Sequence, residues 1–328
     1  MKLNFHENHR LLFGVVFLGF VLLSILVAVG PAIWVQEHNH PLTNSDPLSD
    51  QARRGLRVYI AEGCTYCHTQ QVRPLKEDRD FGRPSTPGDY ARLQPLDFWR
   101  MTPEILGTER TGPDLSNIGN RQSSATWHYI HFYNPRAVVK SSVMQAYPWL
   151  FRVKEKPDSN DVVVPVPKAF APEQGKVVTT QKAQDLVAYV LSLKQVSLPG
   201  MKTAAGSTAT TQTAMSNLGT RVFNNNCASC HQPNGQGVPG TFPPLQGDPV
   251  VTASDPTQHI HTVLFGLQGK TIDGTSYATA MPAHADKLSD KEVAAVINHE
   301  RTSWGNNAPT VTPQQVARIR SQGTGGGQ

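Results

Sequence analysis

The 328-residue chain has only four cysteines, and two short motifs use all of them. Residues 64–68 read Cys-Thr-Tyr-Cys-His, and residues 227–231 read Cys-Ala-Ser-Cys-His. No cysteine is left for a separate structural disulfide. An excess of one charge is also lacking, because residues 50–194 carry 20 Lys and Arg against 15 Asp and Glu, and residues 214–305 carry 5 against 7. This balance gives no basis for a nucleic-acid partner.

Both cysteine motifs have the form C-x-x-C-H, which is typical of covalent attachment of c-type haem. Two thiols add across the two vinyl groups of the porphyrin, and the following histidine ligates the iron. The sequence therefore predicts two haem c groups and an electron-transfer role. The residues assigned to attachment and proximal ligation are Cys64, Cys67 and His68, and Cys227, Cys230 and His231.

Three other interpretations of the motifs are weaker. Zinc sites use paired C-x-x-C motifs, but such pairs usually lie within tens of residues of each other. A redox dithiol expects a βαβ pattern, which the sequence does not show. A pair of structural disulfides would not explain a histidine at the same offset twice.

Residues 11–35 are an uncharged run rich in Leu, Val and Phe. As a helix the run would span about 37 Å, enough for a hydrocarbon core of roughly 30 Å. A cleaved signal peptide is the competing interpretation, but its apolar region is usually about 7–15 residues. Lys2 and Arg10 precede the run and Glu37 follows it, which favours a cytoplasmic N-terminus. We expect a single-pass anchor in a bacterial inner membrane, with the haem domains in the periplasm.

The expected fold is all-α, with one transmembrane helix followed by two cytochrome c domains, the first of which contains long irregular loops. The expected segments are the N-terminus, anchor and connector at 1–49, the first cytochrome c domain at 50–196, a linker at 197–213, the second cytochrome c domain at 214–306, and a disordered tail at 307–328.

A short helical pattern precedes each haem motif, and an amphipathic helix follows it much later. Each early pattern places a glycine four residues before an aromatic residue, which allows a second helix to cross closely. These pairs are Gly55 with Tyr59 and Gly219 with Phe223. The later helices are expected at 181–194 and 289–304, and a Ser-x-x-Glu capping box marks the start of the second.

Methionine is the common sixth ligand of an electron-transfer haem, and it raises the reduction potential. Met281, which lies 50 residues after His231 and just before the last amphipathic helix, is the candidate for the second haem. For the first haem we favour Met144 over Met101, which is expected to be core or loop filler.

Other residues near the motifs are candidates for contacts with the haems. Carbonyl groups around Pro113 and Pro244 would accept a hydrogen bond from the proximal histidines, although either proline also fits a rigid turn. Arg110 and Arg136 are candidate partners of haem propionates, with a surface role as the alternative. His128 and His131 are expected to be packed or bonded to a propionate rather than to ligate a metal.

In several blocks the first part of the chain resembles subunit II of cbb3-type cytochrome c oxidases, their membrane-anchored mono-haem subunit. The resemblance covers the anchor and the chain to about residue 151, and is strongest at residues 57–73, 110–121 and 127–151. It implies that Met144 ligates the haem. It also implies a partner, the haem–copper catalytic membrane subunit that reduces oxygen to water.

The second part resembles a class I cytochrome c domain at residues 222–231, 281–282 and 293–306. Here the chain departs from subunit II, which usually ends after one haem domain. The fused domain therefore suggests that the chain replaces or supplements a separate di-haem delivery subunit.

The leading hypothesis is a non-catalytic di-haem subunit that relays electrons from a periplasmic donor, such as a small cytochrome c, to the haem–copper subunit. One alternative is a membrane-tethered shuttle for a dehydrogenase or a nitric oxide reductase. Another is a di-haem peroxidase, which would need one haem with a displaceable ligand.

Overall fold

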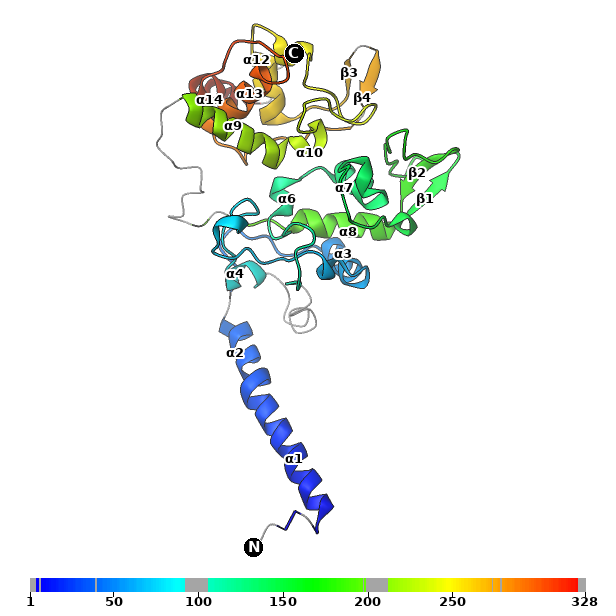
Figure 1. Ribbon diagram of the computed structural model, residues 1–328, viewed down its shortest axis with the longest axis vertical. Helices are drawn as coiled ribbons and strands as arrows, with labels where there is room; N and C mark the ends of the chain where they lie inside the picture. The colour runs from blue at the N-terminus through cyan, green and yellow to red at the C-terminus, as the bar shows by residue number, and fades with distance from the viewer. Residues whose placement is uncertain are drawn as a thin grey trace. The chain divides into compact units, whose positions relative to one another are not determined.

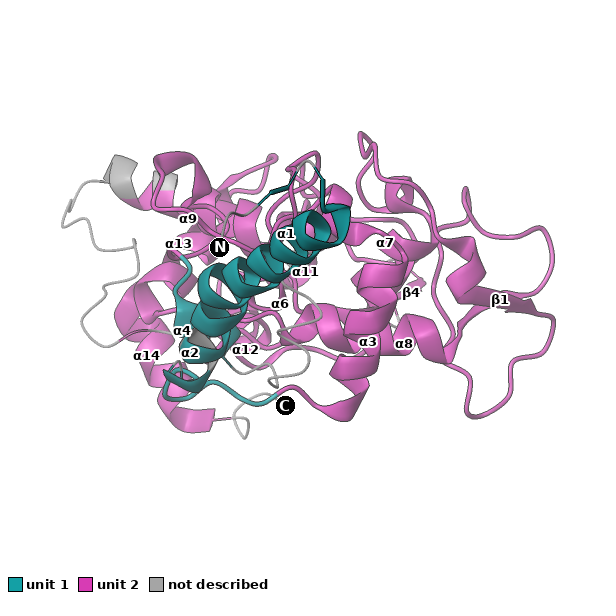
Figure 2. Ribbon diagram, turned by 90° about the horizontal axis from the view of Figure 1, so that it is seen from below, with its two compact units in different colours: residues 1–47, 85–102 teal, residues 48–84, 103–328 magenta. Residues whose placement is uncertain are grey.

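The computed structural model describes residues 4–5, 7–38, 40–91, 106–196, 198, 212–272, 274–277 and 279–323 (Figure 1). The chain forms two compact units, residues 1–47 with 85–102 and residues 48–84 with 103–328 (Figure 2). Apart from residues 85–102, both expected haem domains fall in the second unit. Met101 and most of the expected linker lie outside the described residues.

Most of the described chain is helical. In the first unit the helices are α1 (His9–Ser24), a π-helical turn (Ile25–Val29), α2 (Gly30–His38) and α4 (Pro87–Tyr90). In the second unit the longer elements are α3 (Asp50–Ala61), α7 (Ala125–Tyr133), β1 (Phe151–Lys154), β2 (Lys176–Thr179), α8 (Gln181–Ser192), α9 (Gln212–Asn226), α12 (Thr257–Phe265), β3 (Lys270–Ile272), β4 (Thr275–Tyr277), α13 (Asp290–Thr302) and α14 (Pro313–Gln322). The short helical turns there are Cys64–Tyr66, Lys76–Asp78, α6 (Ile118–Arg121), Pro135–Ala137, Pro148–Leu150, α10 (Ala228–His231) and α11 (Pro249–Thr252).

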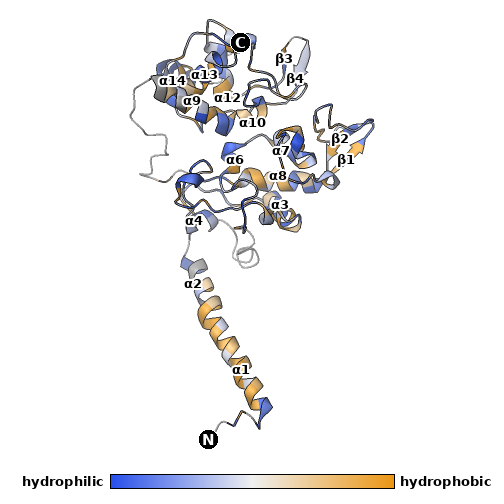
Figure 3. Ribbon diagram, viewed as in Figure 1, coloured by the Kyte–Doolittle hydropathy of each residue, from blue (hydrophilic) through white to orange (hydrophobic). Residues whose placement is uncertain are grey.

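The N-terminal helix is continuous from residue 9 to 34 and is long and apolar enough to cross a membrane (Figure 3). Asn8 caps its start by accepting a hydrogen bond from the backbone N–H of Leu11. The π-helical turn comes just before Pro31, which has no backbone N–H to donate to the preceding turn. Widening of the helix at this point accommodates the proline without a break.

In each haem domain the helix before the motif crosses a later helix at a glycine. A Cβ atom at Gly55 of α3 would lie 1.8 Å from the carbonyl oxygen of Asp185 in α8. A Cβ atom at Gly219 of α9 would lie 2.3 Å from the carbonyl oxygen of Ala295 in α13. Real Cβ atoms do not approach so closely, so the sequence-based expectation of two glycine crossings is confirmed.

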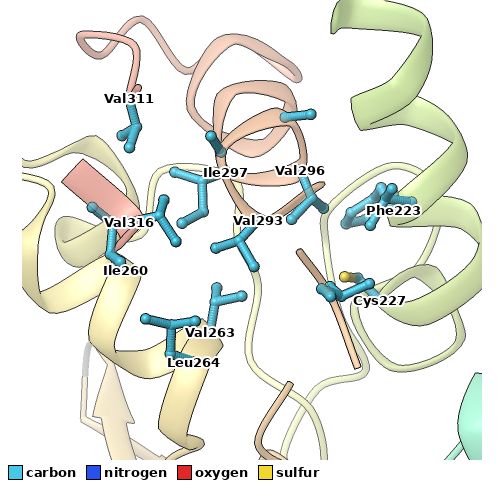
Figure 4. Close-up of a cluster of buried hydrophobic side chains, with 14 of the residues drawn as sticks. Phe223, Cys227, Ile260, Val263, Leu264, Val293, Val296, Ile297, Val311 and Val316 are labelled. Carbon is cyan, nitrogen blue, oxygen red and sulfur yellow. The ribbon is translucent and has the colours of Figure 1, made fainter. Parts of the chain in front are cut away.

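The core of the second haem domain is built on α13 (Figure 4). Its side chains Val293, Val296 and Ile297 are fully buried and pack with Phe223 of α9 and Leu264 of α12. Helix α13 begins at the expected capping box, in which Ser289 and Glu292 each accept a hydrogen bond from the other's backbone N–H. The cap fixes where the helix begins and therefore which of its side chains face the core.

The expectation of a disordered tail at 307–328 is wrong for residues 313–322, which form α14. Thr312 and Gln315 make a capping box, and Pro313 occupies the first turn, where a missing N–H costs nothing. Val316 and Ile319 are buried in the core of the second haem domain. The glycine-rich end suggested disorder for the whole tail and obscured the short amphipathic pattern of residues 313–322. Residues 324–328 lie outside the described residues.

Within the described residues, two antiparallel hairpins add to the helical fold. Strands β1 and β2 pair with Phe151 opposite Thr179, in the first haem domain. Strands β3 and β4 pair with Lys270 opposite Tyr277, and both of these residues line the cavity described below. The second hairpin therefore belongs to the functional site.

We expect Gly55→Ala to destabilise the first haem domain by about 3 kcal/mol, because the added methyl group collides with the backbone of α8 and the two helices must separate. Denaturant unfolding followed by circular dichroism would measure the loss. Gly14→Ala is the control, since a Cβ at Gly14 meets no atom within 4 Å. Equal stability of the two variants would contradict the tight crossing.

Candidate haem centres

The second cysteine motif lies on the wall of a largely apolar cavity. The cavity is lined by Cys227, Cys230 and His231, which come at the end of α9 and in α10, and by Met281. Met281 is held by two backbone hydrogen bonds with Leu267, at 2.8 and 3.1 Å. Both attachment cysteines, the proximal histidine and the expected sixth ligand therefore share one largely apolar cavity, as ligand sites usually are.

The two proximal histidines are oriented in the same way, by a hydrogen bond from Nδ1 to a proline carbonyl. His68 Nδ1 donates to the carbonyl oxygen of Pro113 at 2.8 Å, and His231 Nδ1 donates to that of Pro243 at 2.9 Å. The second acceptor is thus one residue before the expected Pro244, which instead lines the cavity. With Nδ1 committed as a donor, each imidazole keeps Nε2 for the iron.

Burial keeps these imidazoles neutral, as ligation requires. Desolvation lowers the pKa of His68 and that of His231, although each carbonyl partner opposes the shift. Burial also raises the pKa of the Cys64 and Cys230 thiols to about 12, so both are protonated. Within the described ranges no cluster of three or more His, Cys, Asp or Glu side chains is arranged to hold a metal ion.

Three buried polar atoms on the wall of the second cavity have no protein partner. They are Nδ1 of His259, Nδ1 of His284 and Oγ1 of Thr279. Buried polar groups are rarely left unpaired. A haem is an apolar ring with polar propionates at one edge, so an apolar cavity with a few unpaired polar atoms fits this group.

A buried side-chain pair lies beside these atoms and was not predicted from the sequence. His259 Nε2 lies 2.8 Å from a carboxylate oxygen of Glu300, and both side chains are about 4% exposed. Glu300 continues the buried stripe of α13 at helical spacing after Val293, Val296 and Ile297. A carboxylate on an otherwise apolar helix face was the signal that could have revealed it.

The first motif lies against the segment that contains Met144. Burial chiefly, and then the nearby Cys64 thiol, raise the pKa of Tyr147. Trp149 Nε1 donates to the Glu62 carboxylate at 3.0 Å. These contacts place residues 147–149 along the first attachment turn. Ligation of the first iron by the partly buried Met144 stays a prediction, as does ligation of the second iron by Met281.

Glycine at position 112 is what allows the first proximal ring to pack closely. A Cβ atom there would lie 2.2 Å from Cε1 of His68. The backbone N–H of Gly112 also donates to the carbonyl of Cys67 at 2.8 Å. The loop that carries Pro113 is thereby fixed against the attachment turn.

Arg110 is held by protein groups, and its contact with a haem propionate stays a prediction. Its guanidinium donates to Thr69 Oγ1, to a carboxylate oxygen of Asp78 and to the carbonyl of Gln71. Asp78 is buried, and hydrogen bonds from Arg73 and then Arg110 hold its pKa well below the usual range. Arg110 therefore neutralises a protein carboxylate. Arg136 is exposed, and its contact with a propionate stays a prediction.

The two histidines of α7 are packed, as expected. His128 Nε2 donates to the carbonyl of Gln122 at 2.8 Å, and His131 stacks on Trp127 with ring centroids 4.5 Å apart. Burial lowers the pKa of His128 to about 4 and that of His131 to about 3. His131 Nδ1 is a further buried atom without a protein partner.

We expect Met281→Ala to abolish the sulfur-to-iron charge-transfer band of the second haem. Its reduction potential should fall by a substantial part of the roughly 0.8 V range that axial ligands set. Visible spectroscopy and a redox titration of the holoprotein would measure both effects. Met215→Ala is the control, because Met215 packs on the core and is not among the cavity residues. An unchanged spectrum in the Met281 variant would refute the assignment.

The buried His128 should make the first haem domain sensitive to acid. Its folded pKa of about 4 lies below its ordinary value of 6.5, so the unfolded chain binds more protons between these values. The free energy of unfolding should therefore be highest above about pH 6.5 and should fall by up to about 3 kcal/mol as the pH drops to about 4.

The variant His128→Gln removes this titration while an amide N–H can still donate to Gln122. Urea unfolding from about pH 7 to about pH 4.5 should show a shallower loss of stability in this variant than in the wild type. His40→Gln serves as the control, since His40 is exposed. Identical pH profiles for all three proteins would rule out the role of His128.

Comparisons with known proteins agree with this division of the chain. Residues 4–189, more than half of the chain, match the family model of the cytochrome c oxidase mono-haem subunit, FixO. Residues 216–304 match the cytochrome c family model. The two matches imply two covalent haem c groups, one for each C-x-x-C-H motif.

Individual relatives are similar to shorter parts of the chain. The cytochrome c subunit of the quinone alcohol dehydrogenase of Gluconobacter oxydans is 44% identical over 108 residues, which is 33% of this chain and 23% of that protein. The gluconate 2-dehydrogenase cytochrome c subunit of Pantoea cypripedii is 38% identical over 111 residues, 33% of this chain and 25% of that protein.

Cytochrome c-552 of Thermus thermophilus is 39% identical over 105 residues, 29% of this chain and 79% of that protein. The chain spans only about a quarter of the length of the two dehydrogenase subunits. The family match over residues 4–189 is much longer, and it includes the apolar helix, the first haem motif and Met144. The chain therefore belongs to the family of cytochrome c oxidase mono-haem subunits, FixO, and carries a second cytochrome c domain after it.

Proposed function

We propose that this chain is the di-haem electron-transfer subunit of a cbb3-type terminal oxidase. A periplasmic donor, such as a small cytochrome c, reduces the second haem. The electron then passes to the first haem and on to the haem–copper membrane subunit, which reduces oxygen to water. The chain itself would have no oxygen-reducing centre, because His68 with Met144 and His231 with Met281 would hold the two irons and leave no ligand site for oxygen.

The observation that carries this proposal is the extent of the FixO match, residues 4–189. A generic cytochrome c domain would account for the first haem motif alone. It would not account for the block around Met144, whose residues Tyr147 and Trp149 lie along the attachment turn. That block supports an oxidase subunit over a simple shuttle.

The proposed location follows from the anchor. Residues 9–34 are long and apolar enough to span a membrane. Lys2 and Arg10 before the span and Glu37 after it support a cytoplasmic N-terminus and periplasmic haem domains. Tethering keeps the second haem domain at a high effective concentration near the first, so delivery does not depend on a diffusional encounter.

A second candidate function is a membrane-tethered electron shuttle for a dehydrogenase. It is favoured by the relatives named as cytochrome c subunits of quinone alcohol dehydrogenase and gluconate 2-dehydrogenase. Each covers about a third of this chain. Such a shuttle would pass electrons away from a dehydrogenase rather than into an oxidase.

The deciding experiment is gentle detergent extraction of the intact complex, followed by identification of its subunits, haem analysis and oxygen uptake with a reduced donor. We expect a large polytopic subunit with haem b and copper to co-purify, and the complex to consume oxygen. Isolation with a dehydrogenase and without oxygen uptake would instead support the shuttle.

Within the complex, Met144→Ala should lower the potential of the first haem and slow oxygen uptake. The spectrum of the second haem should not change, because its ligands lie in another domain. Met215→Ala should leave oxygen uptake unaffected. Normal uptake by the Met144 variant would remove the first haem from the proposed route.

A further inference from the structure

The second haem-attachment turn contacts the first haem domain directly. Trp127 Nε1 of α7 donates to the backbone carbonyl of Ser229 at 2.9 Å. Gln122 Nε2 donates to the hydroxyl oxygen of the same serine. Ser229 stands between the two residues that attach the second haem, Cys227 and Cys230, so these bonds hold the attachment turn itself.

Two further hydrogen bonds extend the contact beyond this turn. Gln232 Nε2 donates to the carbonyl of Val138 at 3.3 Å, and Thr241 Oγ1 donates to that of Pro165 at 3.1 Å. Gln122 and its neighbour Ser123 also line the second haem cavity. The first domain thus completes the wall of a cofactor site that otherwise belongs to the second domain.

An aromatic pair leads from this contact toward the first haem site. The rings of Trp127 and His131 are stacked, with centroids 4.5 Å apart and planes 14° apart. His131 also lies close enough to His68 for the two imidazoles to interact electrostatically. One end of the pair bonds to the second attachment turn, and the other end approaches the proximal ligand of the first haem.

We propose that residues 122–131 form an internal docking surface for the second haem-attachment turn, and that the Trp127–His131 stack is the electron-transfer contact between the two haem sites. Docking needs no second protein. One electron leaves the ferrous second haem, which becomes ferric, and reduces the ferric first haem to ferrous. No bond forms or breaks and no proton moves. The direction of transfer rests on the proposed function, whereas the docking does not.

The chemistry of the contact suits a tethered domain. All four hydrogen bonds join uncharged groups, and each such bond contributes little free energy to an association in water. The covalent linker makes such weak contacts sufficient, since it replaces association by an intramolecular step. Because none of these four hydrogen bonds joins opposite charges, salt should not weaken them, unlike encounter complexes that depend on charge.

The test uses the full-length holoprotein and the variant Trp127→Phe, which keeps an aromatic ring on His131 and removes the indole N–H. Pulsed electron paramagnetic resonance of the two ferric haems gives the distribution of distances between the irons. Rapid reduction followed by absorbance gives the rate of transfer between the haems. Haem content and both reduction potentials verify that each variant is folded and loaded.

For the wild type we expect one narrow distance distribution and a transfer rate that depends on neither protein concentration nor salt. Trp127→Phe should broaden the distribution and lower the rate by up to about tenfold, the effect of losing one hydrogen bond. Trp149→Phe is the matched control, because Trp149 is in the same domain, is 58% exposed and bonds to Glu62 instead. Its rate should equal that of the wild type.

A broad distance distribution in the wild type would overturn the docking surface. Equal effects of Trp127→Phe and Trp149→Phe, or no effect of either, would overturn the role of the Trp127 contact in transfer between the haems. If Trp127→Phe fails to load haem, Gln122→Ala tests the same surface by removing the bond to the Ser229 hydroxyl. These outcomes are measured on the isolated chain, so they are independent of whether an oxidase co-purifies.

Discussion

The close crossing of two helices at a glycine is the constraint on which each haem domain depends. At Gly55 and at Gly219 the backbone of a later helix occupies the space that a side chain would need. The crossing brings an early helix, which leads into the cysteines, against a late helix that closes the domain. A short domain has too few residues to build a large apolar core of its own. The crossing lets it surround a large flat cofactor, which supplies much of that core.

The two domains share this skeleton but surround their haems with different charges. The first neutralises its buried Asp78 with Arg73 and Arg110, close to the proximal loop. The second places the His259–Glu300 pair and the neutral His284 on the cavity wall. Buried charge and hydrogen bonding near an iron tune its potential. The fold therefore gives two haems of one attachment type separate electrostatic surroundings.

Fusion changes what the contact between the domains has to achieve. Separate electron carriers must find each other and then part, which favours charged and transient surfaces. Here the linker keeps the partners together, and the contact through Ser229 consists of uncharged hydrogen bonds. Such a contact can align two cofactors without the ionic-strength dependence of a diffusional encounter.

The sequence by itself determined the two haem motifs, the apolar span, the glycine–aromatic pairs and the capping box at Ser289, because each is a pattern of residues close together in the chain. Tertiary structure decided the rest. Three features depend on which distant groups meet in the fold. They are the hydrogen bond to Pro243 rather than Pro244, the pairing of Arg110 with Asp78, and the pairing of His259 with Glu300. Likewise, α14 is stable because Val316 and Ile319 find a core built by other helices, which no local pattern reveals.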